Sequence, residues 1–514
     1  MAWPASWTAA VVVLFLLAWH EARQMGVQSD GASISLQAWQ MLHGNLLLRG
    51  WHVADVSFYT TELPVYMLVE AVRGLRPDVV AISAAVNYTL LVAGAAFVAK
   101  GTVRGREGLV RLLLAAGIML APSAAAATWL LNDPDHAATA IWVLLALLVI
   151  DRCGRNWYVP VLVGAVLAWA IVGDPLVEVI GAAPLALVCL VRACQGLVER
   201  REPLRSRMYE LSLAAAAVLS VGVAAAVTHI IKALGGWVAS KGVTEFVPSS
   251  RLPTNLAVAF EDFLGLFSAD FFGAKIGVGL LPIVIHLAGA CLVALALWLA
   301  IRGFLRGGDL VAGVLVAAVV CDLAAYVLLF SATPSDIREV SPVFALGAAL
   351  AGRVLGVPLV RNRLEPLLAV GLACYLLTLG PAISAKARPS ANLALTAWLQ
   401  SHHLGSGIAG YWQANSVVFD SGAKITMRPV KARGNGKTLV PNPWELDTRL
   451  LDPRTNYANF LVTTAPGTSP GRTMTEVAIT TFGKPAHVYR YQGYSILVWN
   501  ENLLSLLPPP PPGA

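Results

Sequence analysis

The chain has 514 residues, of which 57% are hydrophobic and only 13% are charged, and its mean hydropathy is +0.66. Soluble domains carry about a quarter charged residues, so this composition excludes an ordinary soluble protein and indicates a membrane protein with several spans. The net charge of +7 could suggest a nucleic-acid partner, but the basic residues lie in short loops between apolar runs, so we expect no nucleic-acid binding.

Eleven stretches are apolar enough to predict membrane-spanning helices, each of which needs about 20 apolar residues. In chain order they are residues 5–22, 79–99, 109–130, 137–150, 157–172, 177–193, 210–231, 276–301, 309–330, 341–356 and 365–384. Two of them, 137–150 and 341–356, are short for a span, so we expect tilting, a break or an extension there. The six cysteines lack metal-site spacing and are predicted to be small apolar fillers.

The loops between these stretches alternate in charge. One set is basic, at Lys100 to Arg111, Arg152 and Arg155, Arg192 to Arg207, Arg302 and Arg306, and Arg353 to Arg363. Because basic loops stay on the cytoplasmic side, the pattern predicts a multi-pass plasma-membrane protein with a cytoplasmic N-terminus. An odd number of spans then places the C-terminal segment outside the cell.

The predicted domain organisation follows from this change in composition along the chain. Residues 1–385 form the transmembrane domain. Residues 386–503 contain alternating strand patterns such as "HVYRYQGYSILVWN" and a short helical pattern, which predict a small extracytoplasmic α/β domain. Residues 504–514 form a proline-rich tail that is predicted to be disordered.

The first outer loop, residues 25–78, is long and contains two amphipathic stretches, "SISLQAWQMLHGNL" and "ELPVYMLVEAVRGL". Such stretches tend to lie in the plane of the membrane surface. We expect two juxtamembrane helices that either wall a groove or only cap the helical bundle.

Ionisable residues near membrane depth are functional candidates, and here they gather in the less basic loops. They are Asp30, Asp133, Asp135, His136, Asp174, Glu178, Lys232, Glu261, Asp262, Asp270, Lys275, Asp336, Arg338 and Glu339. Helices in a bundle bring the ends of distant loops together, so we expect several of these side chains to share one site.

This arrangement resembles the GT-C superfamily of integral membrane glycosyltransferases. The resemblance covers most of the chain and rests on "SDGA" with Asp30, on "AWQMLHG" at 38–44, on "NDPDH" and "GDPLVE", on "DIREVSPVFALGAALAGRVL", and on the C-terminal domain. The composition, rich in Ala and Val, resembles the actinobacterial members, such as arabinosyl- and mannosyltransferase-like proteins.

The resemblance implies a transferase that moves a sugar from a polyprenyl-phosphate donor to an envelope glycan or lipid acceptor, with inversion. Asp30 matches the family's general base, although this chain has one acid where the family often has two. Arg338 is the predicted ligand of the donor phosphate, with Lys232 and Arg251 as further candidates. The predicted substrate-binding residues also include Asp133, Asp135, His136, Asp174 and Glu339.

Each of these residues has an alternative role. Asp30 could cap a helix that begins near Ser33, and Arg338 could form only a salt bridge. Asp133 and Asp135 could belong to a turn, or they could hold a divalent cation such as Mg²⁺ or Mn²⁺. Asp174 could cap the next span. Tyr411 and Trp412 are predicted to pack in the core of the C-terminal domain rather than to stack on a sugar.

Two other functions stay open. A transporter or flippase would need ionisable residues deep in the membrane, and Asp322 is the main example. A non-catalytic envelope scaffold is the third possibility, because a single acid at position 30 is a weak catalytic signal.

Overall fold

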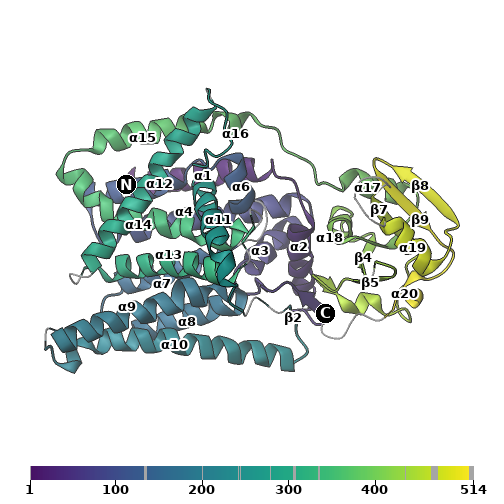
Figure 1. Cartoon of the computed structure of the whole chain (residues 1–514), viewed down its shortest axis with the longest axis horizontal. Helices are drawn as coiled ribbons and strands as arrows, with labels where there is room; N and C mark the ends of the chain where they lie inside the picture. The colour runs from purple at the N-terminus through teal and green to yellow at the C-terminus, as the bar shows by residue number, and fades with distance from the viewer. Residues whose placement is uncertain are drawn as a thin grey trace.

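The computed structural model describes residues 2–508 apart from 132–135, 200, 241, 243–244, 278, 305–307, 331, 334–335, 435 and 465–472. A bundle of long helices occupies one end of the molecule, and a smaller sheet with short helices, formed by residues 393–506, occupies the other (Figure 1). We call the end of the bundle that contacts this sheet the sheet end.

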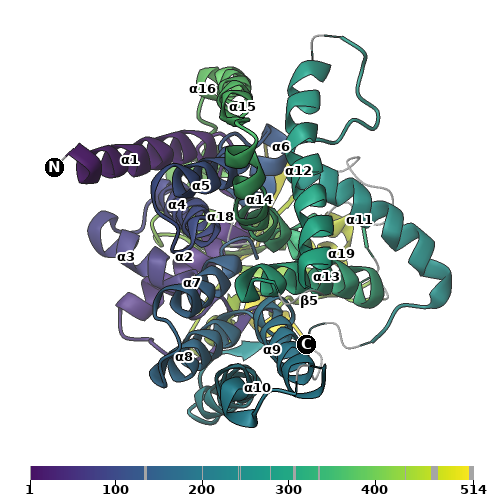
Figure 2. The same ribbon diagram turned by 90° about the vertical axis from the view of Figure 1, so that its left-hand side faces the viewer.

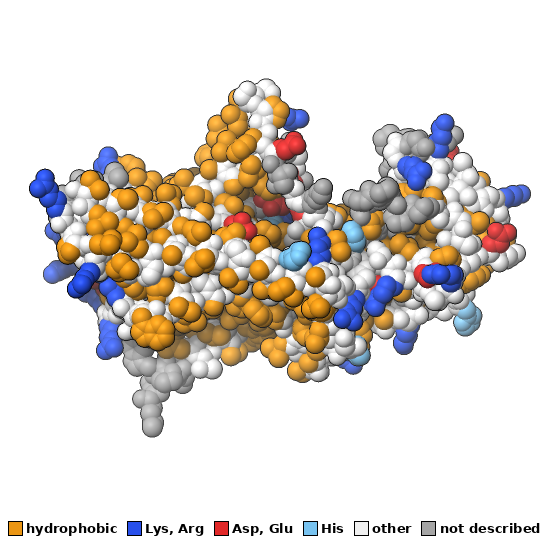
Figure 3. Space-filling model, turned by 90° about the horizontal axis from the view of Figure 1, so that it is seen from below, with side chains coloured by type: hydrophobic (Ala, Val, Ile, Leu, Met, Phe, Trp, Pro, Cys, Tyr) orange, Lys and Arg blue, Asp and Glu red, His pale blue; other side chains and the backbone are white. Residues whose placement is uncertain are grey.

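A helix lies at every stretch that the sequence predicted to span the membrane. The helices are α1 (Ala2–Ala22), α4 (Asp78–Lys100), α5 (Gly105–Met119), α6 (Ala124–Leu130), α7 (Thr139–Arg152), α8 (Tyr158–Gly173), α9 (Ala183–Cys194), α10 (Leu204–Ala233), α12 (Leu280–Phe304), α13 (Leu310–Leu329), α14 (Pro342–Arg361), α15 (Glu365–Thr378) and α16 (Gly380–Ser384). Orange apolar side chains cover much of the bundle surface, as expected for a surface that faces lipid (Figure 3).

The predicted count of eleven spans is not confirmed. Within the described residues, six helical segments are long and apolar enough to cross a membrane, or seven if α5 and α6 form one span. These two helices meet at a bend of 102°, where Pro122 cannot continue the helix and Ser123 caps α6. The helices α8 and α15 are apolar but shorter than a full span, as is the segment Trp7–Ala22 of α1 for which side chains are described.

The central helix of the bundle is α14, which packs against α4, α5, α12 and α13. Its small residues, from Ala345 to Gly352, are buried and let these neighbours approach closely. Figure 2, viewed along the bundle, shows the other helices grouped around α14 with the sheet behind them. The short 3₁₀ turn η4 (Ile337–Val340) leads directly into α14 at the sheet end.

The basic loops lie at the end of the bundle opposite the sheet, where Figure 3 shows several Lys and Arg side chains. There the buried Arg353 pairs with Asp151 at 2.8 Å and also with Asp309, and it donates to the carbonyl of Val98 at 2.7 Å. This single side chain therefore ties together the ends of α4, α7, α13 and α14.

The two predicted juxtamembrane helices are present as α2 (Ser29–Leu42) and α3 (Leu63–Arg73). A third helix outside the bundle, α11 (Leu252–Leu266), lies in the loop before α12. Most of the first half of α2 is buried between α3 and α18 (Tyr411–Asp420), so α2 is a packed element rather than a helix lying on the membrane surface. By contrast, α3 exposes Leu68 and Val72.

The C-terminal part of the chain folds as an α/β unit, as predicted. Its six-stranded sheet has the order β5-β4-β3-β7-β9-β8, in which β3 pairs in parallel with β4 and β7 and the other pairs are antiparallel. The strands are β3 (Ser406–Ala409), β4 (Thr426–Ala432), β5 (Leu439–Pro441), β7 (Phe460–Thr464), β8 (His487–Tyr491) and β9 (Tyr494–Val498). The helices are α17 (Leu393–Ser401), α18, α19 (Met474–Phe482) and α20 (Leu503–Leu506). Leu503 and Leu504 are buried in the core, so ordered structure continues past residue 503, where the tail was predicted to begin.

A second, three-stranded sheet joins the two parts of the molecule. Its central strand β1 (Trp51–Val53) pairs in parallel with β2 (Val238–Ala239) and antiparallel with β6 (Leu446–Asp447). Because β6 belongs to the C-terminal part, this pairing and the packing of α18 on α2 hold the C-terminal residues against the sheet end. No pattern in the sequence predicted this junction.

Candidate active site

A small cavity of about 70 Å³ lies at the sheet end of the bundle. Residues from five separate segments of the chain line it: Asp30, Ala54, Asp55, Val56, Phe58, His136, Arg338, Glu339, Trp444 and Glu445. Asp30, His136, Arg338 and Glu339 were predicted from the sequence to share a site, and all four are found in this cavity.

The first turn of α2 positions Asp30. The residue before this helix, Gln28, makes no side-chain cap, and the Asp30 carboxylate instead accepts a hydrogen bond from the Tyr411 hydroxyl. A helix-capping hydrogen bond is therefore not what holds this carboxylate. Asp30 is mostly buried, which raises its pKa, while the Tyr411 hydrogen bond and the charge of Arg338 oppose the increase.

A second carboxyl group, Glu445, lies on the other side of the Tyr411 hydroxyl. The same hydroxyl hydrogen-bonds to Glu445 Oε2, which also accepts a hydrogen bond from Ser33 Oγ at 2.5 Å. A phenol has one proton and can donate to only one carboxylate, so the second contact requires a proton on a carboxyl group. Burial and the charge of Asp30 raise the pKa of Glu445 to about 8. Glu445 is therefore the carboxyl group that keeps its proton at neutral pH.

A buried histidine links two acids beside the cavity. Asp174 Oδ2 lies 2.6 Å from His136 Nδ1, and Glu339 Oε2 lies 3.0 Å from His136 Nε2. Burial alone would lower the pKa of His136, but the two carboxylates raise it well above its usual value. Both ring nitrogens can then donate, so His136 is an imidazolium held between two carboxylates.

The turn η4 places Arg338 at the edge of the cavity. Its Nε lies 3.4 Å from Glu339 Oε1, and 44% of the side chain is exposed, compared with 14% for Glu339. Glu339 is held from the other side by His136, so a chain of contacts from Asp174 through His136 and Glu339 supports the arginine. This leaves a positive, partly accessible guanidinium within the electrostatic reach of Asp30.

Asp174 and Lys232 do not line the cavity. Asp174 is fully buried; its second oxygen accepts from the Leu176 backbone N–H at 2.9 Å, so it supports His136 and caps the following turn. Lys232 is exposed in the last turn of α10, where its charge acts on His52.

The predicted metal site is not described. Asp133 and Asp135 lie outside the described residues, so a divalent cation at these positions stays a prediction. Among the residues that the structure does describe, no group of three or more His, Cys, Asp or Glu side chains could hold a metal ion.

The sequence patterns did not identify two groups of site residues. One is the stretch from Ala54 to Phe58, including Asp55, in the loop after β1, and the other is Tyr411, Trp444 and Glu445 from the C-terminal part. Tyr411 was predicted to pack in the core of that part but contacts Asp30, and Trp412 was given the same role but is 56% exposed. The acid in "NPWELD" was the available signal for Glu445, but its position depends on the pairing of β6 with β1.

No family model matches the chain, and no curated protein is similar to it. Among solved structures, ArnT from Cupriavidus metallidurans bound to undecaprenyl phosphate has a TM-score of 0.54 and 16% sequence identity, over 98% of this chain and 99% of that chain. The same protein in the apo state has a TM-score of 0.54 and 16% identity, over 99% of this chain and 100% of that chain. The likeness covers both chains from end to end, and at this identity it concerns the fold. The chain therefore has the fold of ArnT over its whole length, which supports the fold that the resemblance in its sequence predicted.

Proposed function

We propose that the protein is a membrane glycosyltransferase that moves a sugar from a polyprenyl-phosphate donor to a hydroxyl group of an envelope glycan or lipid. One observation carries this proposal: Asp30 and Arg338, more than 300 residues apart, line a single cavity at one end of an apolar bundle. The ArnT structure with the same fold contains undecaprenyl phosphate, which supports a donor of this class.

In this reaction Asp30 acts as the general base. Its carboxylate takes the proton of the acceptor hydroxyl as the acceptor oxygen forms a bond to the anomeric carbon. The bond from that carbon to the phosphate oxygen breaks, and polyprenyl phosphate leaves with the electron pair. Attack from the side opposite the phosphate inverts the configuration of the sugar.

Arg338 is suited to the phosphate because its guanidinium presents several N–H donors and a fixed positive charge. The contacts of Glu339 with His136 orient this residue from behind, so His136 and Asp174 are positioning residues. Neither Lys232 nor Arg251 lines the cavity, so the phosphate interaction is assigned to Arg338 among the predicted basic residues.

The cavity has to widen before it can hold a sugar and a phosphate. Its volume of about 70 Å³ is well below the roughly 300–1,000 Å³ of typical ligand sites. Tyr411, Trp444 and Glu445 cover Asp30 from the C-terminal side, so we propose that the acceptor hydroxyl replaces the Tyr411 hydroxyl on Asp30.

The alternation of basic loops supports a plasma-membrane location in which the sheet end faces outward. The C-terminal unit would then be extracytoplasmic and would meet both substrates at the outer face. The division into a transmembrane domain (1–385) and this unit (386–503) is part of the proposal.

The alternative function, that of a transporter, is supported by a single observation. Asp322 is fully buried in α13, and its Oδ2 has no hydrogen-bond partner among the residues that the structure describes. Its charge interacts with His136, Asp174 and Glu339, so it belongs to the group of residues that surrounds the transferase site. This placement favours the transferase.

The experiment is a transfer assay with purified protein and a panel of labelled polyprenyl-phosphate sugars, with an envelope lipid and glycan extract as the acceptor. We expect labelled product from the wild type and at least a 100-fold lower rate from Asp30→Asn. Glu261→Gln is the matched control, because Glu261 is exposed on α11 outside the cavity, and it should keep the wild-type rate. An Asp30→Asn rate equal to that of the control would remove Asp30 as the base.

A further inference from the structure

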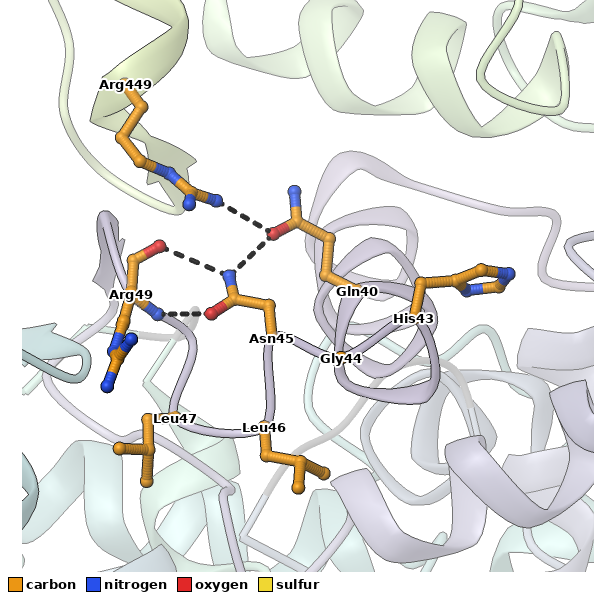
Figure 4. A pocket seen from close by; sticks show the side chains of 8 residues that line it. All are labelled: Gln40, His43, Gly44, Asn45, Leu46, Leu47, Arg49 and Arg449. Carbon is orange, nitrogen blue, oxygen red and sulfur yellow. Dashed lines mark hydrogen bonds between the residues drawn. The ribbon is translucent and has the colours of Figure 1, made fainter.

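A second and larger cavity, of about 550 Å³, lies at the other end of α2 from Asp30. Figure 4 shows its lining residues, which are Gln40, His43, Gly44, Asn45, Leu46, Leu47, Arg49 and Arg449. Ten residues of helix separate Asp30 from Gln40, or roughly 15 Å at 1.5 Å per residue. The transferase site therefore does not include this cavity.

Two arginines from different parts of the molecule meet at this cavity. Arg49 comes from the loop after α2, and Arg449 comes from the 3₁₀ turn η5 (Thr448–Leu451) of the C-terminal part. Gly50, which follows Arg49, lies against the Arg449 side chain, since a Cβ atom at Gly50 would lie 2.6 Å from Arg449 Nε. The Thr448 backbone N–H also donates to the Gly50 carbonyl at 2.8 Å. Figure 4 shows Arg449 extending toward Gln40, while the Arg49 side chain extends in a different direction from the neighbouring loop.

The charge of the cavity is positive. Arg449 pairs with Asp447 at 2.7 Å, but its side chain is still 56% exposed. Arg49 is exposed, and its guanidinium has no hydrogen bond or ion pair within the described part of the chain. Nε and Nη2 of Arg449 both donate to Asp447, at 2.9 and 2.7 Å, so an anion would be held by Nη1 of Arg449 and by the guanidinium of Arg49. Two positive charges with one compensating carboxylate suit an anion such as a phosphate.

The cavity also lies at the level where a membrane span ends. The apolar helix α10 ends at Ala233, and four residues later the Trp237 N–H donates to the carbonyl of Leu47, a lining residue, at 2.9 Å. Leu46 on the cavity wall is 57% exposed, and Leu42 beside it is 37% exposed. An anion-binding surface with exposed leucines at the end of a span matches a lipid with a charged headgroup and apolar chains.

We propose that this cavity binds the anionic headgroup of a membrane phospholipid, with the phosphate between Arg49 and Arg449 and the acyl chains along Leu42 and Leu46. The bound headgroup would connect the loop after α2 to η5, and so hold the C-terminal part against the bundle. The proposal rests on the membrane location of the chain and not on its transferase activity.

The test measures lipid binding to the purified full chain in neutral detergent by native mass spectrometry. The two probes, dioctanoyl phosphatidylglycerol and dioctanoyl phosphatidylcholine, have the same acyl chains but differ in net headgroup charge. We expect the wild type to bind phosphatidylglycerol at least fivefold more tightly. The double variant Arg49→Gln/Arg449→Gln should lose this preference and keep its weak binding of phosphatidylcholine.

The control is Arg454→Gln/Arg490→Gln, which removes the same charge from two exposed positions outside the cavity. It should bind like the wild type. Equal binding of both lipids by the wild type, or an equal loss in the two double variants, would overturn the proposal. If the cavity double variant does not fold, Arg49→Gln alone provides the test, because this side chain makes no described contact.

Discussion

Glu445 offers a prediction that stability measurements can test without any substrate. Its pKa rises from 4.5 to about 8 in the folded protein, because the group is buried beside Asp30. Above about pH 4.5 this carboxyl group releases its proton in the unfolded chain, whereas in the folded chain it keeps the proton until about pH 8. Between these two values a rise in pH therefore favours the unfolded state. Stability should therefore fall as the pH rises through this window.

The size of the effect follows from the same values. At pH 7 the solution is 2.5 pH units above the unfolded value of 4.5, and each unit corresponds to about 1.4 kcal/mol. Keeping the proton on Glu445 therefore costs up to about 3 kcal/mol at pH 7 and less than about 1 kcal/mol at pH 5. Glu445→Gln replaces the protonated acid with a neutral group of the same shape and removes this cost.

The assay compares thermal unfolding of Glu445→Gln and the wild type in detergent from pH 5 to pH 8 at a fixed scan rate. The variant should gain about 2–3 °C in Tm over the wild type across this range, because 1 kcal/mol is worth about 1 °C for a chain of this size. Glu501→Gln, a change at an exposed glutamate of the same region, should show no such trend. A Tm difference that is constant or shrinks as the pH rises would refute the account of Glu445.

Three further predictions concern the polar residues of the bundle. Arg338→Gln should raise the KM for the donor at least tenfold in the transfer assay. Arg338→Lys should restore only part of the donor affinity, since lysine keeps the positive charge but lacks the paired N–H donors of the guanidinium. An equal rise in KM for both variants would contradict the phosphate role. His136→Ala should destabilise the detergent-solubilised protein by about 3 kcal/mol, because it leaves two buried carboxylates without their imidazolium. The stabilisation by His136 is fully present below pH 6.5 and is lost only as the pH rises through the higher pKa of the folded protein. The stability difference between variant and wild type should therefore persist at pH 7. Arg353→Ala should lower the free energy of unfolding by about 3–5 kcal/mol, because it leaves Asp151 unpaired, whereas Arg361→Ala, at an exposed position, should leave it nearly unchanged. Similar folded yields and Tm values for the two variants would contradict a structural role of Arg353.

Much of the helical architecture was predictable from the sequence, because apolar length determines which segments can leave water. The positions of all eleven predicted stretches coincide with helices. The number of these helices that cross the membrane was not predictable in the same way. The bend at Pro122 turns one apolar run into two short helices, and α15 is apolar but shorter than the membrane thickness requires.

The candidate site was predictable only where it lies close to the helix ends. Asp30 and Arg338 were identified because each sits beside an apolar run, and the GT-C resemblance implied that they meet. Tyr411 and Glu445 were not, because their positions depend on contacts that span about 380 to 410 residues, such as the Ser33–Glu445 hydrogen bond. Local patterns carry no information about such contacts, and in Tyr411 the ordinary core role was the better local prediction.

The central claim is that Arg338 holds the donor phosphate while Asp30 serves the acceptor. The most direct measurement is the binding of a labelled polyprenyl phosphate to the wild type, Arg338→Gln and Asp30→Asn in detergent, alongside their transfer rates. The account predicts that Arg338→Gln loses binding at least tenfold, whereas Asp30→Asn binds like the wild type and fails only in transfer. Wild-type binding by Arg338→Gln would contradict it, as would normal transfer by Asp30→Asn.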